Sequence, residues 1–342
     1  MFRRIFYWDY NYINEYKDKK ENKIHYGYIK MRGVDIDMTI GLPRAMLYYR
    51  YKVLWETFFK ELSCDIVTSG ETNKQILHDG IKFSIDECCL PAKIYMGHVY
   101  SLIGRCDYIL IPRIASCREK NDVCVKLNAL YDIVKSTFEN ANILDYNVDA
   151  YNGESEKKAF INMGRRLGNG YLKTLTAYKK AKKAQSQAEK QKNALQAMTL
   201  ENSSGVKILM VSHPYNIYDR LIGYPITQYI SSLGGVCISA DASDKKESRA
   251  RSEEISETLY WLYNKELVGS IKLLENKIDG IILLTAFPCG PDSLVNELII
   301  RKSTRIPTIN IILDELQGEA GMQTRVESFL DIIKERARVK SV

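Results

Sequence analysis

The sequence lacks any apolar run long enough to cross a lipid bilayer, and no apolar signal-peptide core follows its basic start, Met1-Phe2-Arg3-Arg4. It also lacks the Gly-x-x-x-x-Gly-Lys-Ser/Thr and Gly-x-Gly-x-x-Gly fingerprints of phosphate-binding loops. These absences predict a cytoplasmic protein that does not enter a membrane. They also indicate that nucleotide chemistry, if needed, belongs to a partner.

Close metal-binding pairs of the Cys-x-x-Cys type are missing, although the chain has eight cysteines. Zinc sites normally use such pairs, because one turn then supplies two ligands of a tetrahedron. A disulfide framework is not expected either, because cytoplasmic thiols are kept reduced. Three cysteines lie at the edges of apolar strands and are interpreted as core thiols: Cys64, Cys106 and Cys237. The other five are predicted to stand in loops beside prolines, glycines and charges: Cys88, Cys89, Cys117, Cys124 and Cys289.

The charge balance gives no sign of a nucleic-acid-binding protein. The 49 Lys and Arg residues exceed the 42 Asp and Glu residues by seven. Much of this excess lies in 179–183 and 190–192, within one predicted helix, and no pattern of stacking aromatics accompanies it. We therefore expect no nucleic-acid partner.

A chain of 342 residues is longer than one core usually serves, so two domains are expected. Strand-like apolar runs alternate with helical patterns, which predicts parallel sheets. The expected fold class is α/β, with two Rossmann-like (flavodoxin-like) halves that face a cleft. We predict an N-terminal extension (1–36), a first α/β domain (37–150), a helical connection (151–204) and a second α/β domain with a C-terminal helix (205–342).

The individual elements are predicted from apolar periodicity and from Gly and Pro. In the first domain we expect strands at 38–42, 65–67 and 107–111, a loop at 112–122, and a helix at 72–79 that Gly80 stops. In the second we expect strands at 206–211, 236–238, 280–287 and 308–313, and helices at 223–233, 253–264, 265–276 and up to about 337. The segments 106–112 and 278–283 are similar, which indicates a duplication.

Cys89, Cys124 and Cys289 share one local setting, a loop that opens a helix. Open α/β sheets bind their ligands beyond strand ends, in such loops. The free N–H groups and the dipole of the following helix favour a thiolate, the form that binds metal or attacks substrate. Single cysteines on separate loops suit an iron–sulfur cluster, because each iron can take a thiolate from a different element.

Several motifs together resemble stand-alone proteins related to 2-hydroxyacyl-CoA dehydratases and their activases. The motifs are Asp86-Glu87-Cys88-Cys89-Leu90-Pro91-Ala92-Lys93 with Gly97-His98-Val99, Ile111-Pro112-Arg113-Ile114 ahead of Cys124, Phe287-Pro288-Cys289-Gly290-Pro291-Asp292-Ser293, and Leu313-Asp314-Glu315 with Gly318-Glu319-Ala320-Gly321 and Thr324-Arg325-Val326-Glu327. The resemblance extends from Met38 to Phe329. One departure is Cys124-Val125, where relatives carry Cys-Pro.

The resemblance implies a [4Fe–4S] cluster held by Cys89, Cys124 and Cys289, with the fourth iron open. Cys88 and Cys117 are alternative ligands, and a double-cubane cluster is the alternative cofactor. Residues around the ligands are implied as a supporting set: Lys93, His98, Asp314, Glu315 and Glu319. The competing interpretations are a partly buried histidine for His98, a helix-covering lysine for Lys93, and capping or solvated charge for the carboxylates.

The resemblance also implies a function. The chain would accept a low-potential electron from an ATP-dependent activase and act reductively on an acyl-CoA or another small molecule, as a dehydratase-like lyase or a component of an ATP-coupled reductase. The alternative is a non-enzymatic iron–sulfur electron-transfer or assembly module, since fold alone does not determine function. A homodimer or a heterodimer both remain open.

Overall fold

The structure is a computed structural model that describes residues 38–118, 121–302, 306–316 and 318–340. The chain divides into two units, Met1–Ile36 and Asp37–Val342. The predicted N-terminal extension lies outside the described residues. Every element named below belongs to the second unit.

The first half of this unit is built on a mostly parallel sheet. Its strands are β1 (Thr39–Leu42), β2 (Asp65–Thr68), β3 (Tyr108–Arg118), β4 (Asn121–Asp122) and β5 (Ile143–Asp149). Strands β2, β1, β3 and β5 lie side by side in that order, and all their pairings are parallel. The two-residue strand β4 pairs antiparallel with the far end of β3.

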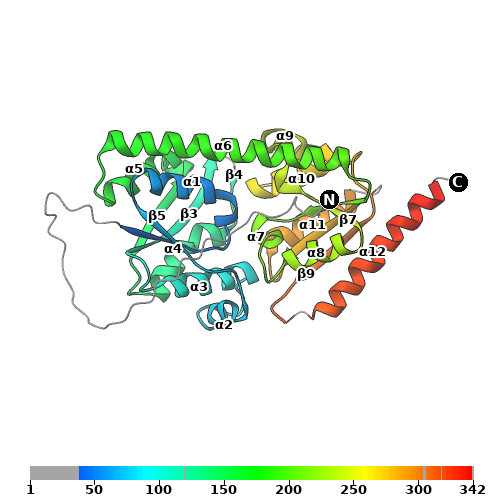
Figure 1. The fold of residues 1–342 in the computed structure, drawn as a ribbon, viewed down its shortest axis with the longest axis horizontal. Helices are drawn as coiled ribbons and strands as arrows, with labels where there is room; N and C mark the ends of the chain where they lie inside the picture. The colour runs from blue at the N-terminus through cyan, green and yellow to red at the C-terminus, as the bar shows by residue number, and fades with distance from the viewer. Residues whose placement is uncertain (1–37, 119–120, 303–305, 317, 341–342) are drawn as a thin grey trace. The chain divides into compact units, whose positions relative to one another are not determined.

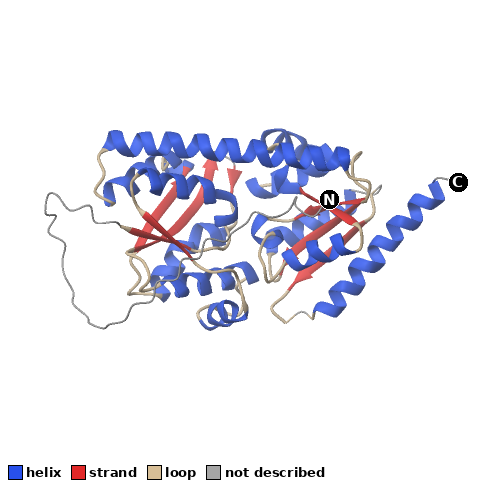
Figure 2. Ribbon diagram, viewed as in Figure 1, coloured by secondary structure: helices blue, strands red, loops and turns tan. Residues whose placement is uncertain are grey.

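The second half repeats this plan. Its strands are β6 (Val206–Val211), β7 (Gly235–Ser239), β8 (Gly280–Ala286) and β9 (Thr308–Leu313). They are parallel and lie in the order β7-β6-β8-β9. In both halves the first strand in the sequence therefore lies between the second and the third. Figure 2 shows the two groups of strands in red, each among its helices. The predicted α/β fold with two Rossmann-like halves is confirmed.

The two halves also share a detail of strand pairing. Asp107, just before β3, accepts a hydrogen bond from the backbone N–H of Thr39 at 2.8 Å, and its own N–H donates to the Thr39 carbonyl at 3.0 Å. Asp279, just before β8, makes the same two bonds with Lys207, at 2.7 and 2.8 Å. This repeated side-chain contact supports the duplication that the sequence indicates.

Helices cover both sheets (Figure 1). They are α1 (Tyr48–Glu61), α2 (Lys74–Lys82), α3 (Leu90–Leu102), α4 (Val125–Thr137), α5 (Glu156–Arg166), α6 (Tyr171–Asn202), α7 (Pro214–Ile217), α8 (Tyr224–Ser232), α9 (Lys245–Arg251), α10 (Leu262–Leu274), α11 (Gly290–Lys302) and α12 (Glu319–Lys340). Short 3-10 turns are η1 (Ala150–Asn152), η2 (Ala240–Ala242) and η3 (Ser252–Glu254). Among the described residues, no helix is long and apolar enough to cross a membrane.

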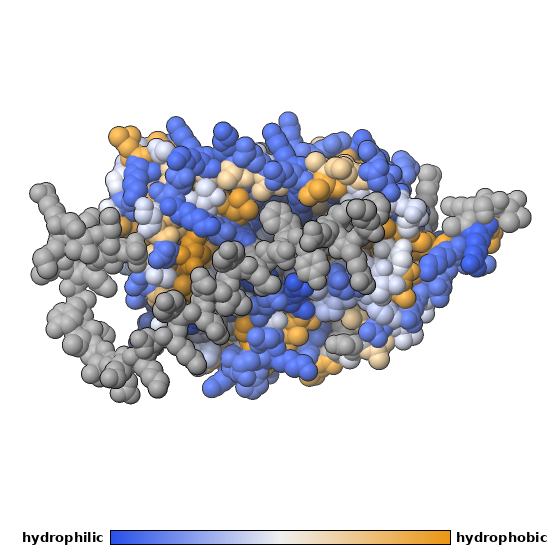
Figure 3. Space-filling model, in the orientation of Figure 1, coloured by the Kyte–Doolittle hydropathy of each residue, from blue (hydrophilic) through white to orange (hydrophobic). Residues whose placement is uncertain are grey.

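Helix α6 connects the halves. It packs against α1 and α5 of the first half and contacts β7 and η2 of the second (Figure 1). Its outer surface is mostly hydrophilic, as the upper edge of Figure 3 shows. One inward contact is made by the buried Gln185, whose side chain accepts from the N–H of Leu54 and donates to the carbonyl of Arg50. Helix α6 lies within the helical connection expected at 151–204.

The second sheet has an apolar layer on each face, as expected for a parallel sheet. All seven residues of β8 are buried. Ile282 and Leu284 join the core that continues from the first half, whereas Ile281 and Leu283 join a separate cluster on the other face. Because side chains alternate along a strand, a continuous apolar run is needed to cover both faces. Strand β8, which precedes Cys289, is therefore held by apolar packing on both faces of the sheet.

Four local expectations are wrong. Strand β3 continues through Pro112 to Arg118, so 112–122 is not simply a loop, and Cys117 lies in a strand. The extension forms because β5 pairs with β3 along its length. Helix α2 runs past Gly80 to Lys82. The two helices expected at 253–264 and 265–276 are a single helix, α10, preceded by a short α9 at 245–251.

Candidate functional site

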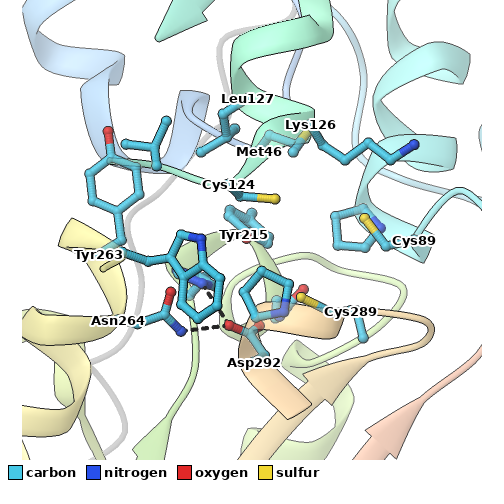
Figure 4. Close-up of a pocket in the computed structure, with 17 residues that line it drawn as sticks. Met46, Cys89, Cys124, Lys126, Leu127, Tyr215, Tyr263, Asn264, Cys289 and Asp292 are labelled. Atoms are coloured by element: carbon cyan, nitrogen blue, oxygen red, sulfur yellow. Dashed lines mark hydrogen bonds and ion pairs between the residues drawn. The ribbon is translucent and has the colours of Figure 1, made fainter. Parts of the chain in front are cut away.

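Three predicted ligand cysteines come together in one pocket. Cys89, Cys124 and Cys289 all line it, and Figure 4 shows their sulfur atoms around a common space. Its empty volume is about 500 Å³. Cys89 and Cys124 belong to the first half and Cys289 to the second, so the pocket lies between the two sheets. The sequence prediction that these thiols face one cavity agrees with this geometry, while their role as ligands stays a prediction.

Each of these cysteines stands immediately before a helix. Cys89 is the N-cap of α3, Cys124 is the N-cap of α4, and Cys289 directly precedes the first residue of α11. Pro91 in the first turn of α3 suits a helix start, where no partner for its missing N–H is needed. The backbone at these positions therefore directs three thiols from three separate helix ends into the pocket.

Burial decides the protonation of these thiols. It raises the pKa of Cys89 to about 11, and it also raises the pKa values of Cys124 and Cys289 above that of an ordinary thiol. The pKa of Cys289 is raised further by the nearby carboxylate of Asp292. The helix ends alone would favour thiolates, but the loss of hydration outweighs them. Without a bound cation, all three groups are thiols at neutral pH.

A buried polar network forms the wall beside Cys289. Asp292 Oδ1 lies 3.1 Å from His213 Nε2 and accepts a hydrogen bond from Asn264 Nδ2 at 2.8 Å (Figure 4). Burial by itself would raise the pKa of Asp292, but the charge of His213 and the hydrogen bonds from its neighbours bring it below the usual value. Asp292 is therefore a fixed negative charge in the pocket wall.

Aromatic rings form another part of the pocket wall. Tyr215 stacks on His213 with ring centroids 4.9 Å apart, and Trp261 and Tyr263 come from the start of α10. The pocket thus has apolar surface as well as a few fixed polar groups. This combination is typical of sites that bind small molecules.

The alternative ligands Cys88 and Cys117 do not line this pocket. Cys88 is buried, and its sulfur lies 3.5 Å from the ammonium of Lys126. Cys117 lies within β3 beside Arg50 and Tyr263, and burial raises its pKa. Neither thiol accompanies the three cysteines of the pocket.

The predicted supporting residues occupy different places. Lys93 is buried on α3, and its ammonium pairs with Glu315 at 2.9 Å, which joins the first half to the turn after β9. Asp314 caps the N–H of Glu315. Glu319 is the first residue of α12, and its side chain lies outside the part that the structure describes. None of the described residues of 314–321 lines the cysteine pocket.

His98 lies in a separate network of buried hydrogen bonds. Its Nε2 is 2.9 Å from Thr72 Oγ1, its Nδ1 is 2.9 Å from Ser69 Oγ, and Thr72 donates to Asp219 of the second half. Burial lowers the pKa of His98 to about 3, so its ring is neutral. These contacts agree with the competing interpretation, in which His98 is a buried histidine with a hydrogen-bond partner for each ring nitrogen.

Residues 39–242, more than half of the chain, match the model of a protein family described as the CoA enzyme activase uncharacterised domain. The chain belongs to this family. No curated protein matches the chain. The family description relates the chain to CoA enzyme activases, in agreement with the resemblance seen in the motifs.

The family match covers the first half, α6 and the first two strands of the second half. Cys89 and Cys124 therefore lie within the family domain, whereas Cys289 lies outside the matched residues. The pocket is completed by a segment that the family model does not include. The bond from the N–H of Leu90 to the carbonyl of Phe287, at 3.0 Å, joins the two cysteine loops directly.

Sequence reasoning missed several pocket residues of this family member. Asp292 lies in the motif around Cys289, and His213 follows a predicted strand, so both could have been found as groups at strand ends. Trp261, Tyr263 and Asn264 carry no such signal, because their segment was expected to form the end of a helix at 253–264 and not the start of one. Their position depends on where α10 begins.

Proposed function

We propose that this protein binds a [4Fe–4S] cluster through Cys89, Cys124 and Cys289. In this proposal it receives a low-potential electron from an ATP-dependent activase and acts reductively on an acyl-CoA or another small molecule. The observation that carries the proposal is the convergence of three thiols, from three helix starts and both halves, on one pocket. The family membership supports a role in the chemistry of CoA enzyme activases.

The chemistry of the donor set fits such a cluster. Thiolate sulfur is the ligand that iron–sulfur clusters require, and three ligands leave one iron open. Among the described residues, no group of three or more His, Cys, Asp or Glu side chains is arranged to hold a single metal ion. A cluster places different demands on its ligands, because each iron takes its own thiolate. The cluster would supply one-electron transfer at the open iron.

The raised pKa values of the three thiols affect how they would bind iron. Each thiol must lose its proton to bind iron, so a bound cation replaces protons that burial otherwise holds on the sulfurs. The same shifts disfavour a free thiolate nucleophile, because that form is scarce at neutral pH. The pocket is therefore better suited to metal ligation than to covalent catalysis by cysteine.

The rest of the pocket favours an enzyme over a simple electron carrier. Trp261 and Tyr215 offer apolar surface to a ligand, and Asn264, His213 and Asp292 offer fixed polar groups. A carrier needs no such room beside its cluster. These side chains would bind and orient the substrate and exclude water from it.

Exposed apolar side chains next to the ligand cysteines suit a docking partner. Val125 follows Cys124 and is 71% exposed, and Phe287, two residues before Cys289, is 54% exposed. Exposed apolar side chains beside a functional site often mark a protein–protein interface. We infer that the activase docks here.

The function is tested by turnover with the activase, ATP and a panel of acyl-CoA thioesters under anaerobic conditions. The proposal predicts that an acyl-CoA is consumed and that Trp261→Ala slows its consumption without loss of iron. Tyr260→Ala is the matched control, because Tyr260 is 65% exposed and does not line the pocket. Reduction of the protein without consumption of any substrate would instead support the electron-transfer module. Failure of the activase to reduce the protein would contradict both.

A further inference from the structure

A second pocket adjoins the cysteine pocket. Arg50 of α1 lines it from the first half, and Lys245 and Ser248 of α9 line it from the second. Its empty volume is about 260 Å³. His213 and Tyr263 line both pockets, so the two cavities share a wall. Nothing in the proposed cluster chemistry uses this second space.

Three hydrogen-bonding groups of this pocket have no partner. Arg50 Nε, Ser243 Oγ and Ser248 Oγ are all shielded from solvent and make no hydrogen bond within the protein. Ser248 is only 1% exposed. Buried polar groups are nearly always satisfied, because leaving one unpaired costs free energy. Three such groups lining a single cavity indicate that a polar ligand completes them.

The charged side chains at the pocket are held in ion pairs. Arg50 and Arg249 both pair with Glu266, at 2.8 and 2.6 Å. Lys245 pairs with Glu189, and Lys192 pairs with Asp241. Arg249, Glu189 and Lys192 do not line the pocket, so its wall carries two cations, Arg50 and Lys245, and two carboxylates, Asp241 and Glu266.

Burial and a neighbouring cation both act on Lys245. Its pKa is lowered, first by burial and then by the nearby charge of Arg50. Two cations held close together in a buried cavity repel each other, and an anion between them would relieve that repulsion. The planar guanidinium of Arg50 also matches the geometry of a carboxylate or a phosphate.

We propose that this second pocket binds an oxyanion, the carboxylate or phosphate group of a small molecule, through Arg50, Lys245, Ser243 and Ser248. The bound group would join α1 of the first half to α9 of the second. If the proposed function holds, the bound oxyanion would lie beside the cluster, across the wall formed by His213 and Tyr263, and that placement rests on the proposed function. Oxyanion binding itself needs no cluster.

The test uses the full-length, iron-free protein in chloride buffer. Isothermal titration with inorganic phosphate and, separately, with succinate measures binding, while succinamide and added sodium chloride are the controls for shape and ionic strength. The proposal predicts saturable binding of at least one oxyanion and none of succinamide. Binding of phosphate alone or of succinate alone identifies which group the pocket accepts.

Variants then locate the site. Ser248→Ala and Lys245→Gln are each expected to weaken oxyanion binding about tenfold or more, because each removes a donor to a charged ligand. Ser270→Ala is the matched control, since Ser270 is a buried serine of α10 whose hydroxyl already donates to Leu267. Cys289→Ser should also bind normally, which separates this test from that of the cluster. No saturable binding, or equal binding by Ser248→Ala, Lys245→Gln and the wild type, would overturn the proposal.

Discussion

At the residue scale, the network around His98 shows how a neutral imidazole can join the two halves. The Ser69 hydroxyl donates to Nδ1 of the neutral ring, and the N–H at Nε2 donates to Thr72 Oγ1. The Thr72 hydroxyl then donates to Asp219, which also accepts from Tyr49 at 3.3 Å. Each of these hydroxyl and imidazole protons is then donated to a single acceptor. A protonated ring would donate from both nitrogens, so the Ser69 hydroxyl would have to turn to the carbonyl of Leu42, 3.5 Å away.

This chain makes stability depend on pH. The pKa of His98 is about 3 in the folded protein and about 6.5 in the unfolded chain, so the unfolded state binds the extra proton between these values. Stability is therefore full above pH 6.5 and falls as the pH is lowered toward 3. From pH 7 to pH 5 we expect a loss of about 2 kcal/mol from this group. Urea unfolding at the two pH values measures it.

The loss due to His98 is isolated by comparing variants. His98→Gln should lose about 2 kcal/mol less than the wild type between pH 7 and pH 5. His78→Gln removes an exposed imidazole and should follow the wild type. Burial raises the pKa of Asp219, which acts in the opposite direction at lower pH, but that group is present in all three proteins. Identical losses in the wild type and His98→Gln would refute the assignment.

At the scale of elements, the position of Cys89 depends on how closely α2 and α3 pack. A Cβ atom on Gly97 of α3 would lie 1.9 Å from the carbonyl oxygen of Ile76, and one on Gly80 of α2 would lie 1.9 Å from that of Lys93. Neither contact is sterically possible. These two glycines thus let the helices meet backbone to backbone, which explains why Gly80 does not stop α2.

Gly97→Ala tests this packing. The added methyl group must push α2 and α3 apart, so we expect a loss of about 1–3 kcal/mol in the free energy of unfolding. Gly70→Ala is the control, because a Cβ at Gly70 would meet no atom within 4 Å. It should change stability by less than about 0.5 kcal/mol. Urea unfolding of both variants distinguishes them, and an unchanged Gly97→Ala protein would show that the helices can separate freely.

At the scale of the whole second unit, local pattern predicted the two parallel sheets, the bridging helix and the helix starts at the three cysteines. It failed where contacts between distant segments determine where a strand ends or a helix begins. Pro112 suggests a strand end, yet β5 holds β3 in place beyond it. The start of α10 and the pocket residue Trp261 also depend on packing between distant segments. The cysteines were found because a helix start and a thiol are both visible in the sequence.

The three thiols of the pocket belong to different halves, Cys89 and Cys124 to the first and Cys289 to the second. Any group that binds all of them must join the halves across the pocket, in addition to contacts that already do so, such as Leu90 with Phe287, Lys93 with Glu315 and Thr72 with Asp219. Loss of one thiol from either half should therefore prevent stable binding of such a group. The strand and core thiols, such as Cys237 in β7, have no part in the pocket.

The most direct measurement is an anaerobic count of iron and sulfide, with an EPR spectrum of the reduced protein, after reconstitution of the wild type and cysteine variants. We expect about four irons per wild-type chain. Cys89→Ser, Cys124→Ser and Cys289→Ser should lose stable iron binding, while Cys237→Ser, the matched control, should keep it. An iron-free wild-type protein, or iron lost in Cys237→Ser but retained in Cys289→Ser, would contradict the account.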